Sequence, residues 1–226
     1  DKSYNGAWMP GFEALSVASN CHKNPDLLFV DHIVANVEEK KMDKWKSFYE
    51  NVFGFSTFVK FDESDISTKY SSLKSVVVRS KNWKVKLPIN EPAQGLKKSQ
   101  ITEFLDFNNG PGVQHIAIQT EDIIYAIKSL RRNGVEFLEV PDTYYENLAD
   151  RIGNIQEDIE ELKKNKILVD SDEEGYLLQL FTKPIQDTPT LFIEIIQRRG
   201  SRGFGQGNFQ ALFEAIEREQ EKRGNL

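Results

Sequence analysis

The chain has 226 residues, of which 39% are hydrophobic and 28% charged, an ordinary composition for one large or two small globular domains. Its net charge of -6 argues against a nucleic-acid or anionic-membrane partner, and no apolar run reaches the roughly 18 residues that a membrane span needs. The single cysteine excludes an internal disulfide and a thiolate metal cluster, which favours a reducing, cytoplasmic location.

The first predicted elements form a strand–helix–strands unit. Residues 1–28 carry Gly, Pro, Asn and Ser without a sustained period, and we interpret them as a linker that arrives from something upstream. A strand is predicted at 28–37 (LFVDHIVANV), followed by a helix whose apolar residues recur at helical spacing until Gly54. Further strands are predicted at 55–61, 72–80 and 83–90.

The same pattern then begins again. Residues 112–137 (GVQHIAIQTEDIIYAIKSLRRNGVEF) align with residues 29–55 after one residue is removed, and this alignment places His115 on His32. Such a repeat indicates two copies of one supersecondary unit. A charged insertion at 144–167, interpreted as helical, interrupts the second copy. The remaining strands are predicted at 175–183 and 190–198.

The C-terminus contains a glycine-rich segment, GSRGFGQGN, followed by an amphipathic helix from about Phe209 to Lys222. The apolar stripe of this helix has the spacing i, i+3, i+4, i+7 and consists of Phe209, Leu212, Phe213 and Ile216. We interpret the glycines as a hinge and the helix as a lid over the functional site. The alternative is a terminal helix that completes the core.

Two of the three histidines, His32 and His115, occupy equivalent positions in the two repeats, so they converge if the units pack by pseudo-symmetry. A lone histidine in an apolar strand is more often a structural residue, but a repeat-equivalent pair reverses those odds. Glu194 lies in another apolar strand, where a buried charge is costly unless it is paired or bound to a metal. The alternative for Glu194 is a salt bridge to Arg198 or Arg199.

Two imidazoles and one carboxylate on one face leave adjacent positions open on an octahedral metal. That arrangement suits iron(II) and oxygen activation rather than structural zinc. Other residues of the predicted strands are candidates for a pocket: Gln179 and Phe181 share one strand face, and Phe192 shares the face of Glu194. Neutral hydrogen bonds are available from further polar residues, for each of which a structural role is the alternative: Ser75, Asn90, Gln100 and Gln114.

Six long stretches resemble the 4-hydroxyphenylpyruvate dioxygenase family, in family order and over nearly everything from about Phe29 to Leu226. They are DHIVANV, YSSLKSVVV, LPINEP, KKSQITEFLDFNNGPGVQHIAIQTEDI, EEGYLLQLFTKPIQDTPTLFIEIIQR and GFGQGNFQALFEAIEREQEKRGNL. The resemblance implies an α+β vicinal-oxygen-chelate fold, in which two βαβββ modules form a half-open barrel around the metal and a C-terminal helix is added. It also implies that His32, His115 and Glu194 are iron(II) ligands.

The implied domain organisation is an interdomain linker at 1–28 and a catalytic domain at 29–226. Within that domain, module one spans about 29–92, module two about 112–198 and the lid helix about 208–222. Family members carry an additional N-terminal domain of the same fold, whereas this sequence begins in what resembles the interdomain linker.

Carried over position by position, the resemblance implies polar residues around the substrate ring at Ser75, Asn90, Gln100 and Gln114. It implies that the remaining pocket wall and the C-terminal helix contribute Gln179, Phe181, Phe192, Phe204, Asn208, Phe209, Leu212 and Phe213.

The implied activity is the Fe(II)- and O2-dependent oxidative decarboxylation and ring hydroxylation of 4-hydroxyphenylpyruvate to homogentisate, a step of tyrosine catabolism. This aromatic substrate carries its own 2-oxo acid, so no 2-oxoglutarate is expected, and we expect a homo-oligomer, either a dimer or a tetramer. The nearest alternative is 4-hydroxymandelate synthase, which hydroxylates the benzylic carbon of the same substrate; Asn90 and the aromatic C-terminal helix favour the dioxygenase. Two further alternatives are an extradiol ring-cleavage enzyme and a non-catalytic ligand-binding protein of the same fold.

Overall fold

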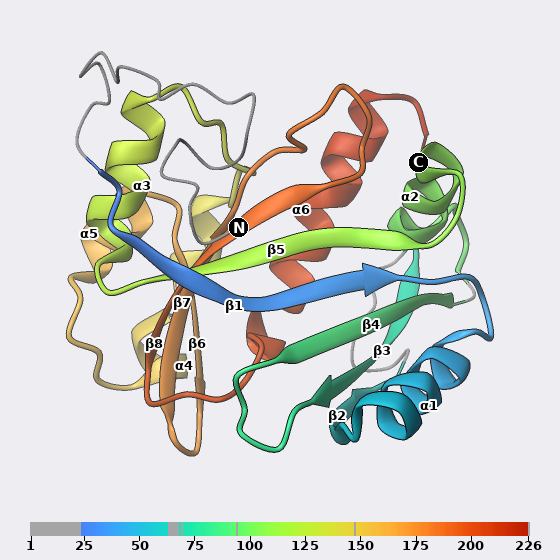
Figure 1. The fold of residues 1–226 in the computed structure, drawn as a ribbon. Coiled ribbons are helices and arrows are strands. Elements are labelled where there is room, and N and C mark those ends of the chain that lie inside the picture. Colours follow the sequence, from blue (N-terminus) through green and yellow to red (C-terminus); the bar gives the residue numbers. More distant parts are fainter. Residues whose placement is uncertain (1–23, 63–67, 69, 94, 147, 226) are drawn as a thin grey trace, which may run out of the picture.

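The computed structural model describes residues 24–62, 68, 70–93, 95–146 and 148–225, and most of the predicted linker lies outside them. Eight strands form one sheet in the order β2-β3-β4-β1-β5-β8-β7-β6 (Figure 1). This order is symmetric about the antiparallel β1–β5 pair, because β4 lies parallel to β1 and β8 lies parallel to β5. The sheet therefore has the two equivalent halves that the sequence repeat predicted.

The first half contains β1 (Leu27–Asn36), α1 (Met42–Phe53), β2 (Ser56–Phe61), β3 (Ser72–Arg79) and β4 (Lys86–Ala93). α1 ends where predicted, because Gly54 has a φ of 65°, its N–H donates to the carbonyl of Glu50, and the N–H of Phe55 donates to the carbonyl of Tyr49. That left-handed conformation favours glycine. The four strands lie within a few residues of the predicted ranges.

The second half contains β5 (Gly112–Thr120), α3 (Ile123–Arg132), β6 (Leu168–Asp172), β7 (Gly175–Phe181) and β8 (Phe192–Arg199). The insertion between α3 and β6 is helical as predicted, but it is divided into short pieces: η1 (Asp142–Tyr145), α4 (Leu148–Ile152) and α5 (Ile159–Lys164). β6 was not predicted from the sequence. Its second half is polar in sequence and therefore lacks the apolar pattern of a strand. In the structure, the carboxylates of Asp170 and Asp172 accept hydrogen bonds from the glycine-rich segment.

Two further helices lie outside the modules: α2 (Gln100–Asn108) connects them, and α6 (Phe209–Lys222) follows the short η2 (Gln206–Asn208). α2 was not predicted, although Ser99 is a typical N-cap residue and its hydroxyl accepts from the N–H of Thr102 at 3.2 Å. α6 has the predicted bounds. In the described part of the chain, no helix combines the length and apolarity needed to cross a membrane.

The two faces of the sheet have different surroundings. In β3, the side chains of Leu73, Ser75 and Val77 line a cavity. The alternate residues Val76 and Val78 pack into a core cluster with α1. α1 therefore covers the outer face of the first half, whereas α6 lies on the inner, concave side, between the two halves (Figure 1).

The glycine-rich segment before α6 is fixed by hydrogen bonds. The N–H of Gly203 donates to Asp172 at 2.9 Å, and the N–H of Gly207 donates to Asp170 at 3.0 Å. A Cβ at Gly205, where φ is 75°, would lie 2.1 Å from Oε1 of Gln179. These glycines permit close approach and positive φ rather than free rotation, so the hinge and lid stay predictions for experiment.

Candidate metal centre

The three candidate ligands lie together in the central strands, His32 on β1, His115 on β5 and Glu194 on β8. Nε2 of each histidine is 3.2 Å from the same oxygen, Oε2 of Glu194. One ligand atom from each residue lies within 4.8 Å of the others, and none of the three residues is more than 6% exposed. The pseudo-symmetric packing expected from the repeat thus brings the histidines together, and the carboxylate joins them.

Both imidazole rings are oriented through their other nitrogen. Nδ1 of His32 donates to Oδ1 of Asp31 at 2.7 Å, and Nδ1 of His115 donates to Oε1 of Gln114 at 3.0 Å. Such partners fix the tautomer and the ring plane of metal-bound histidines. Both Nε2 atoms are left for a shared ion, so the donor set fits a divalent metal.

A bulge next to each histidine makes this orientation possible. Successive residues of a regular strand point to opposite faces, so Asp31 and His32 would normally diverge. Along β1 the pairing advances from Val30 to His32 while β5 advances by a single residue, which leaves Asp31 as an extra residue. Gln114 is the extra residue beside His115 on β5. The bulges re-aim both neighbours toward the rings.

The charges of the three ligands depend on one another. Burial alone would raise the pKa of Glu194, but the charge on His32 and the hydrogen bonds from both histidines lower this pKa to about 2. Burial lowers the pKa of His115 below its ordinary value. Burial also acts to lower the pKa of His32, but the charge of Glu194 and the hydrogen bond to Asp31 raise it overall. These shifts favour an anionic Glu194 and a neutral His115, which are the forms in which each side chain can bind a metal.

Arg198 and Arg199, the alternative partners considered for Glu194, pair with other carboxylates. Arg198 forms a bidentate pair with Asp31, with Nε and Nη2 both 2.9 Å from its carboxylate oxygens. Arg199 pairs with Glu157 at 3.4 Å. Among the described residues, the ion pairs of Glu194 are those with His32 and His115.

Asp31 was missed by the sequence reasoning. Its side chain is 1% exposed, and it also accepts from Nζ of Lys86 at 3.0 Å. Burial raises its pKa, but the hydrogen bonds from His32 and Arg198 and the charge of Arg198 hold that pKa well below the usual range. The signal available in the sequence was an acid directly before a candidate ligand in an apolar strand.

The triad lies in the wall of the cavity inside the half-barrel. Five of the six polar residues proposed for the pocket line this cavity: Ser75, Asn90, Gln100, Gln114 and Gln179. Five of the proposed apolar residues also line it: Phe181, Phe204, Phe209, Leu212 and Phe213. The sequence analysis did not assign the remaining wall residues, which are apolar: Val34, Phe61, Leu73, Val77, Pro88 and Ile216.

Phe192 and Asn208, also proposed for the pocket, lie one layer behind its wall. The ring of Phe192 stacks on His115 with centroids 4.8 Å apart and an interplanar angle of 22°. Asn208 is fully buried and donates to Oε1 of Gln179 at 3.5 Å, while its own Oδ1 accepts from Tyr144 at 2.5 Å. Their positions favour support of His115 and Gln179 over direct contact with a ligand.

The sequence matches the profile of the Glyoxalase/Bleomycin resistance protein/Dioxygenase superfamily over residues 29–180. Proteins named 4-hydroxyphenylpyruvate dioxygenase from Yarrowia lipolytica and Dictyostelium discoideum are 51% and 52% identical to this chain. The alignments cover 99% of this chain but 59% and 63% of those proteins. The chain thus spans less than two thirds of the length of these relatives.

A solved structure supports the same fold. It is a mutant of 4-hydroxymandelate synthase from Streptomyces coelicolor, with a TM-score of 0.79 and 36% sequence identity. The match covers 94% of this chain and 61% of that one. The two-module architecture of the sheet is therefore shared with a solved relative.

Proposed function

The chain belongs to the Glyoxalase/Bleomycin resistance protein/Dioxygenase superfamily, and on that premise we propose that it forms the catalytic part of a 4-hydroxyphenylpyruvate dioxygenase. The proposed reaction converts 4-hydroxyphenylpyruvate and O2 to homogentisate and CO2 at an iron(II) ion held by His32, His115 and Glu194. One observation carries the proposal: Nε2 of both histidines lies 3.2 Å from the same oxygen of Glu194, in the wall of a cavity lined by aromatic residues.

The charges of the cavity wall fit a substrate that binds through a metal. Besides the triad, the wall residues are neutral, and no lysine or arginine is among the described residues that line it. A 2-oxo acid anion in this cavity therefore needs the positive charge of a divalent ion as its counter-charge. When bound, iron(II) would supply the activation of O2 and the electrophilic centre for decarboxylation of a chelating 2-oxo acid.

The chain's own residues orient the substrate and exclude water. Phe181 on β7 and Phe209 on α6 both line the cavity and can hold an aromatic ring by stacking or edge contacts. The neutral donors and acceptors Asn90, Gln100 and Gln179 can bind a phenolic hydroxyl without placing a second charge in the cavity. The apolar side of α6 keeps bulk water from the oxidising centre.

The test is the product formed by purified protein, reconstituted with iron(II), from 4-hydroxyphenylpyruvate and O2. We expect homogentisate, with one O2 consumed and one CO2 released per substrate and no requirement for 2-oxoglutarate. A strict requirement for 2-oxoglutarate would contradict the proposal. 4-Hydroxymandelate as the main product would identify the synthase instead, and ligand binding without turnover would identify a binding protein.

We predict that Asn90→Ile lowers homogentisate formation about tenfold, since loss of one hydrogen bond near the ring corresponds to about 1.4 kcal/mol. Asn90 lines the cavity, and its Nδ2 donates to Oδ1 of Asn36 at 3.4 Å. The measurement is the rate of homogentisate formation together with the ratio of homogentisate to other products.

Asn36→Ala is the matched control, because it removes the same hydrogen bond but Asn36 does not line the cavity. Both variants are expected to lose stability, and only Asn90→Ile is expected to change the rate or the product ratio. Equal effects on the reaction in the two variants would mean that Asn90 has a structural role alone.

Three earlier expectations stay predictions: a homo-oligomer, a cytoplasmic location and the domain limits. Size measurement in solution tests the first, and localisation of the tagged protein tests the second. Expression of 29–226 alone tests the third.

A further inference from the structure

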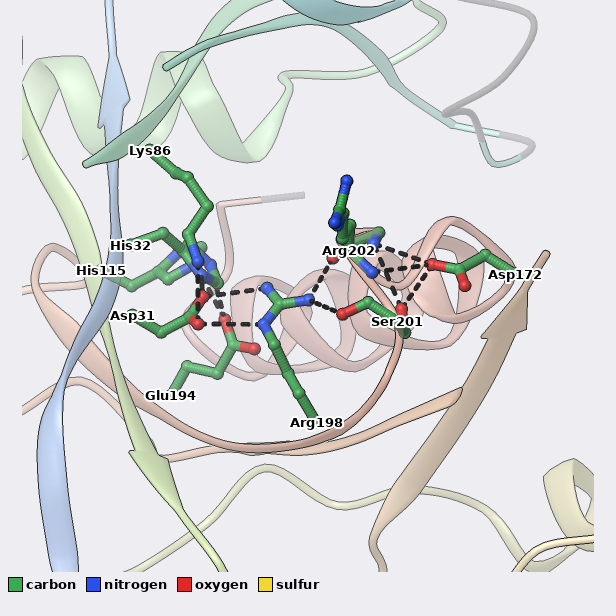
Figure 2. Close-up of polar contacts among 10 residues, drawn as sticks. Asp31, His32, Lys86, His115, Asp172, Glu194, Arg198, Ser201 and Arg202 are labelled. Carbon is green, nitrogen blue, oxygen red and sulfur yellow. Dashed lines mark hydrogen bonds and ion pairs between the residues drawn. The ribbon is translucent and has the colours of Figure 1, made fainter. Parts of the chain in front are cut away.

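One arginine joins the metal centre to the segment that leads into α6. The guanidinium of Arg198 uses Nε and Nη2 for Asp31 and Nη1 for the carbonyls of Ser201 (3.2 Å) and Gly203 (2.7 Å). Figure 2 shows these contacts continuing from His32 through Asp31 and Arg198 to Ser201 and Asp172. A planar fork with several donors can hold two partners at once in fixed directions, which an ammonium group cannot do.

The two histidines are held unequally. Gln114, the partner of His115, is a neutral amide, whereas Asp31, the partner of His32, is a buried carboxylate whose position is set by cations. Among the described residues, Arg198 therefore links the His32 side of the site, and not the His115 side, to the segment that leads into α6. Lys86 neutralises Asp31 as well, but its hydrogen bond in the described part of the chain goes to Asp31 and not to residues 201–203.

Residues 201–203 are held from their other side by Asp172. Its carboxylate accepts from the hydroxyl of Ser201 at 2.5 Å and from the N–H groups of Arg202 and Gly203 at 3.1 and 2.9 Å. The next residue, Phe204, lines the cavity, and its ring centroid is 5.1 Å from that of His32 and 5.7 Å from Cζ of Arg198. The anchored segment thus places a wall residue against a ligand.

We propose that Arg198 is a positioning residue that couples His32 to residues 201–204. Metal binding at His32 orders this segment, and anchoring of the segment in turn strengthens metal binding. Reciprocity is required by thermodynamics, because both events favour the same arrangement of Asp31 and Arg198. The inference depends on the proposed metal site and not on the proposed substrate.

The first test measures binding of cobalt(II), used as a spectroscopic probe of the site, by absorption titration. Arg198→Lys keeps the charge but loses the fork, and its dissociation constant should rise about 10- to 100-fold, as for other partners of metal-bound histidines. Arg199→Lys is the matched control: the neighbouring arginine pairs with Glu157 and should bind cobalt as the unmodified protein does. Equal affinity in both variants would overturn the proposal.

The second test measures hydrogen exchange of the amides of Arg202 and Gly203, with and without cobalt(II). Cobalt should slow their exchange in the unmodified protein but not in Arg198→Lys. Asp172→Asn, which does not contact Asp31 in the described structure, should speed exchange and also weaken cobalt binding several-fold. If the exchange rates of these amides in the unmodified protein are the same with and without cobalt(II), the proposed coupling is wrong. This outcome is decisive even if Arg198→Lys fails to fold.

These outcomes separate the two proposals. Cobalt binding with the expected coupling but no homogentisate would remove the proposed reaction and leave the role of Arg198 intact. Absence of cobalt binding in the unmodified protein would remove the metal site and the coupling together.

Discussion

Replacing Glu194 by Gln is expected to abolish iron binding and to lower turnover at least ~1000-fold, which corresponds to about 4 kcal/mol of activation free energy. The amide keeps the size of the side chain but removes the anionic oxygen that lies 3.2 Å from both Nε2 atoms. Two neutral imidazoles alone would then have to hold a divalent ion. His32→Ala and His115→Ala should cause the same loss. The measurements are iron per chain, expected to be one in the unmodified protein, and homogentisate formation.

Glu91→Gln is the matched control for the loss of a buried carboxylate. Glu91 is 8% exposed and accepts from the N–H of Met42 at 3.0 Å, away from the triad. This variant should lose some stability but keep one iron per chain. A full iron content in Glu194→Gln would exclude Glu194 from the ligand set, and the same result for either histidine variant would exclude that histidine.

Deleting residues 204–226 is expected to leave metal binding largely intact while homogentisate formation falls at least ~100-fold, since closure over such sites excludes water and completes the cavity. All three ligands lie on β1, β5 and β8, outside the deleted part. The deletion removes five wall residues: Phe204, Phe209, Leu212, Phe213 and Ile216. Oxygen should be consumed with little product, which simultaneous measurement of O2 uptake and homogentisate would detect.

The same deletion should lower the melting temperature, because α6 contributes to the core. Phe213 is 2% exposed and packs in a cluster with Phe61 and Leu73, and truncation of a buried Phe costs about 3–5 kcal/mol. The far end of α6 is also held, since Nη2 of Arg223 donates to Glu103 at 2.7 Å. Core packing and sealing of the cavity are thus two roles of one helix.

Two point variants separate these roles if the truncated protein does not fold. Leu212→Ala opens the cavity wall at a partly buried position, and it should lower the yield of homogentisate per O2 consumed. Gln210→Ala alters an exposed residue of the same helix and should leave that yield unchanged. Equal yields in both variants, or normal turnover after truncation, would show that α6 does not seal the site.

The sequence by itself determined the two-module fold and identified the three candidate metal ligands that the structure brings together. The repeat that aligns His115 with His32 predicts equivalent places in two equivalent halves, and the antiparallel β1–β5 pair brings those halves together. Glu194 was identifiable because a carboxylate in an apolar strand requires a partner. Local signals also gave α1 and α6, whose hydrophobic spacing and, for α1, the terminal Gly54 are read within one segment.

Only the tertiary structure decided how the ligands are oriented and what surrounds them. A one-residue bulge changes which face a side chain occupies, and pairing between β1 and β5, about 80 residues apart, decides where it forms. Arg198 was a candidate partner for Glu194, but the bulge turns Asp31 toward it instead. Asn208 and Phe192 carry no sequence mark that separates the cavity wall from the layer behind it. Such positions depend on packing between distant segments, because burial is a property of the assembled sheet and helices rather than of a local pattern.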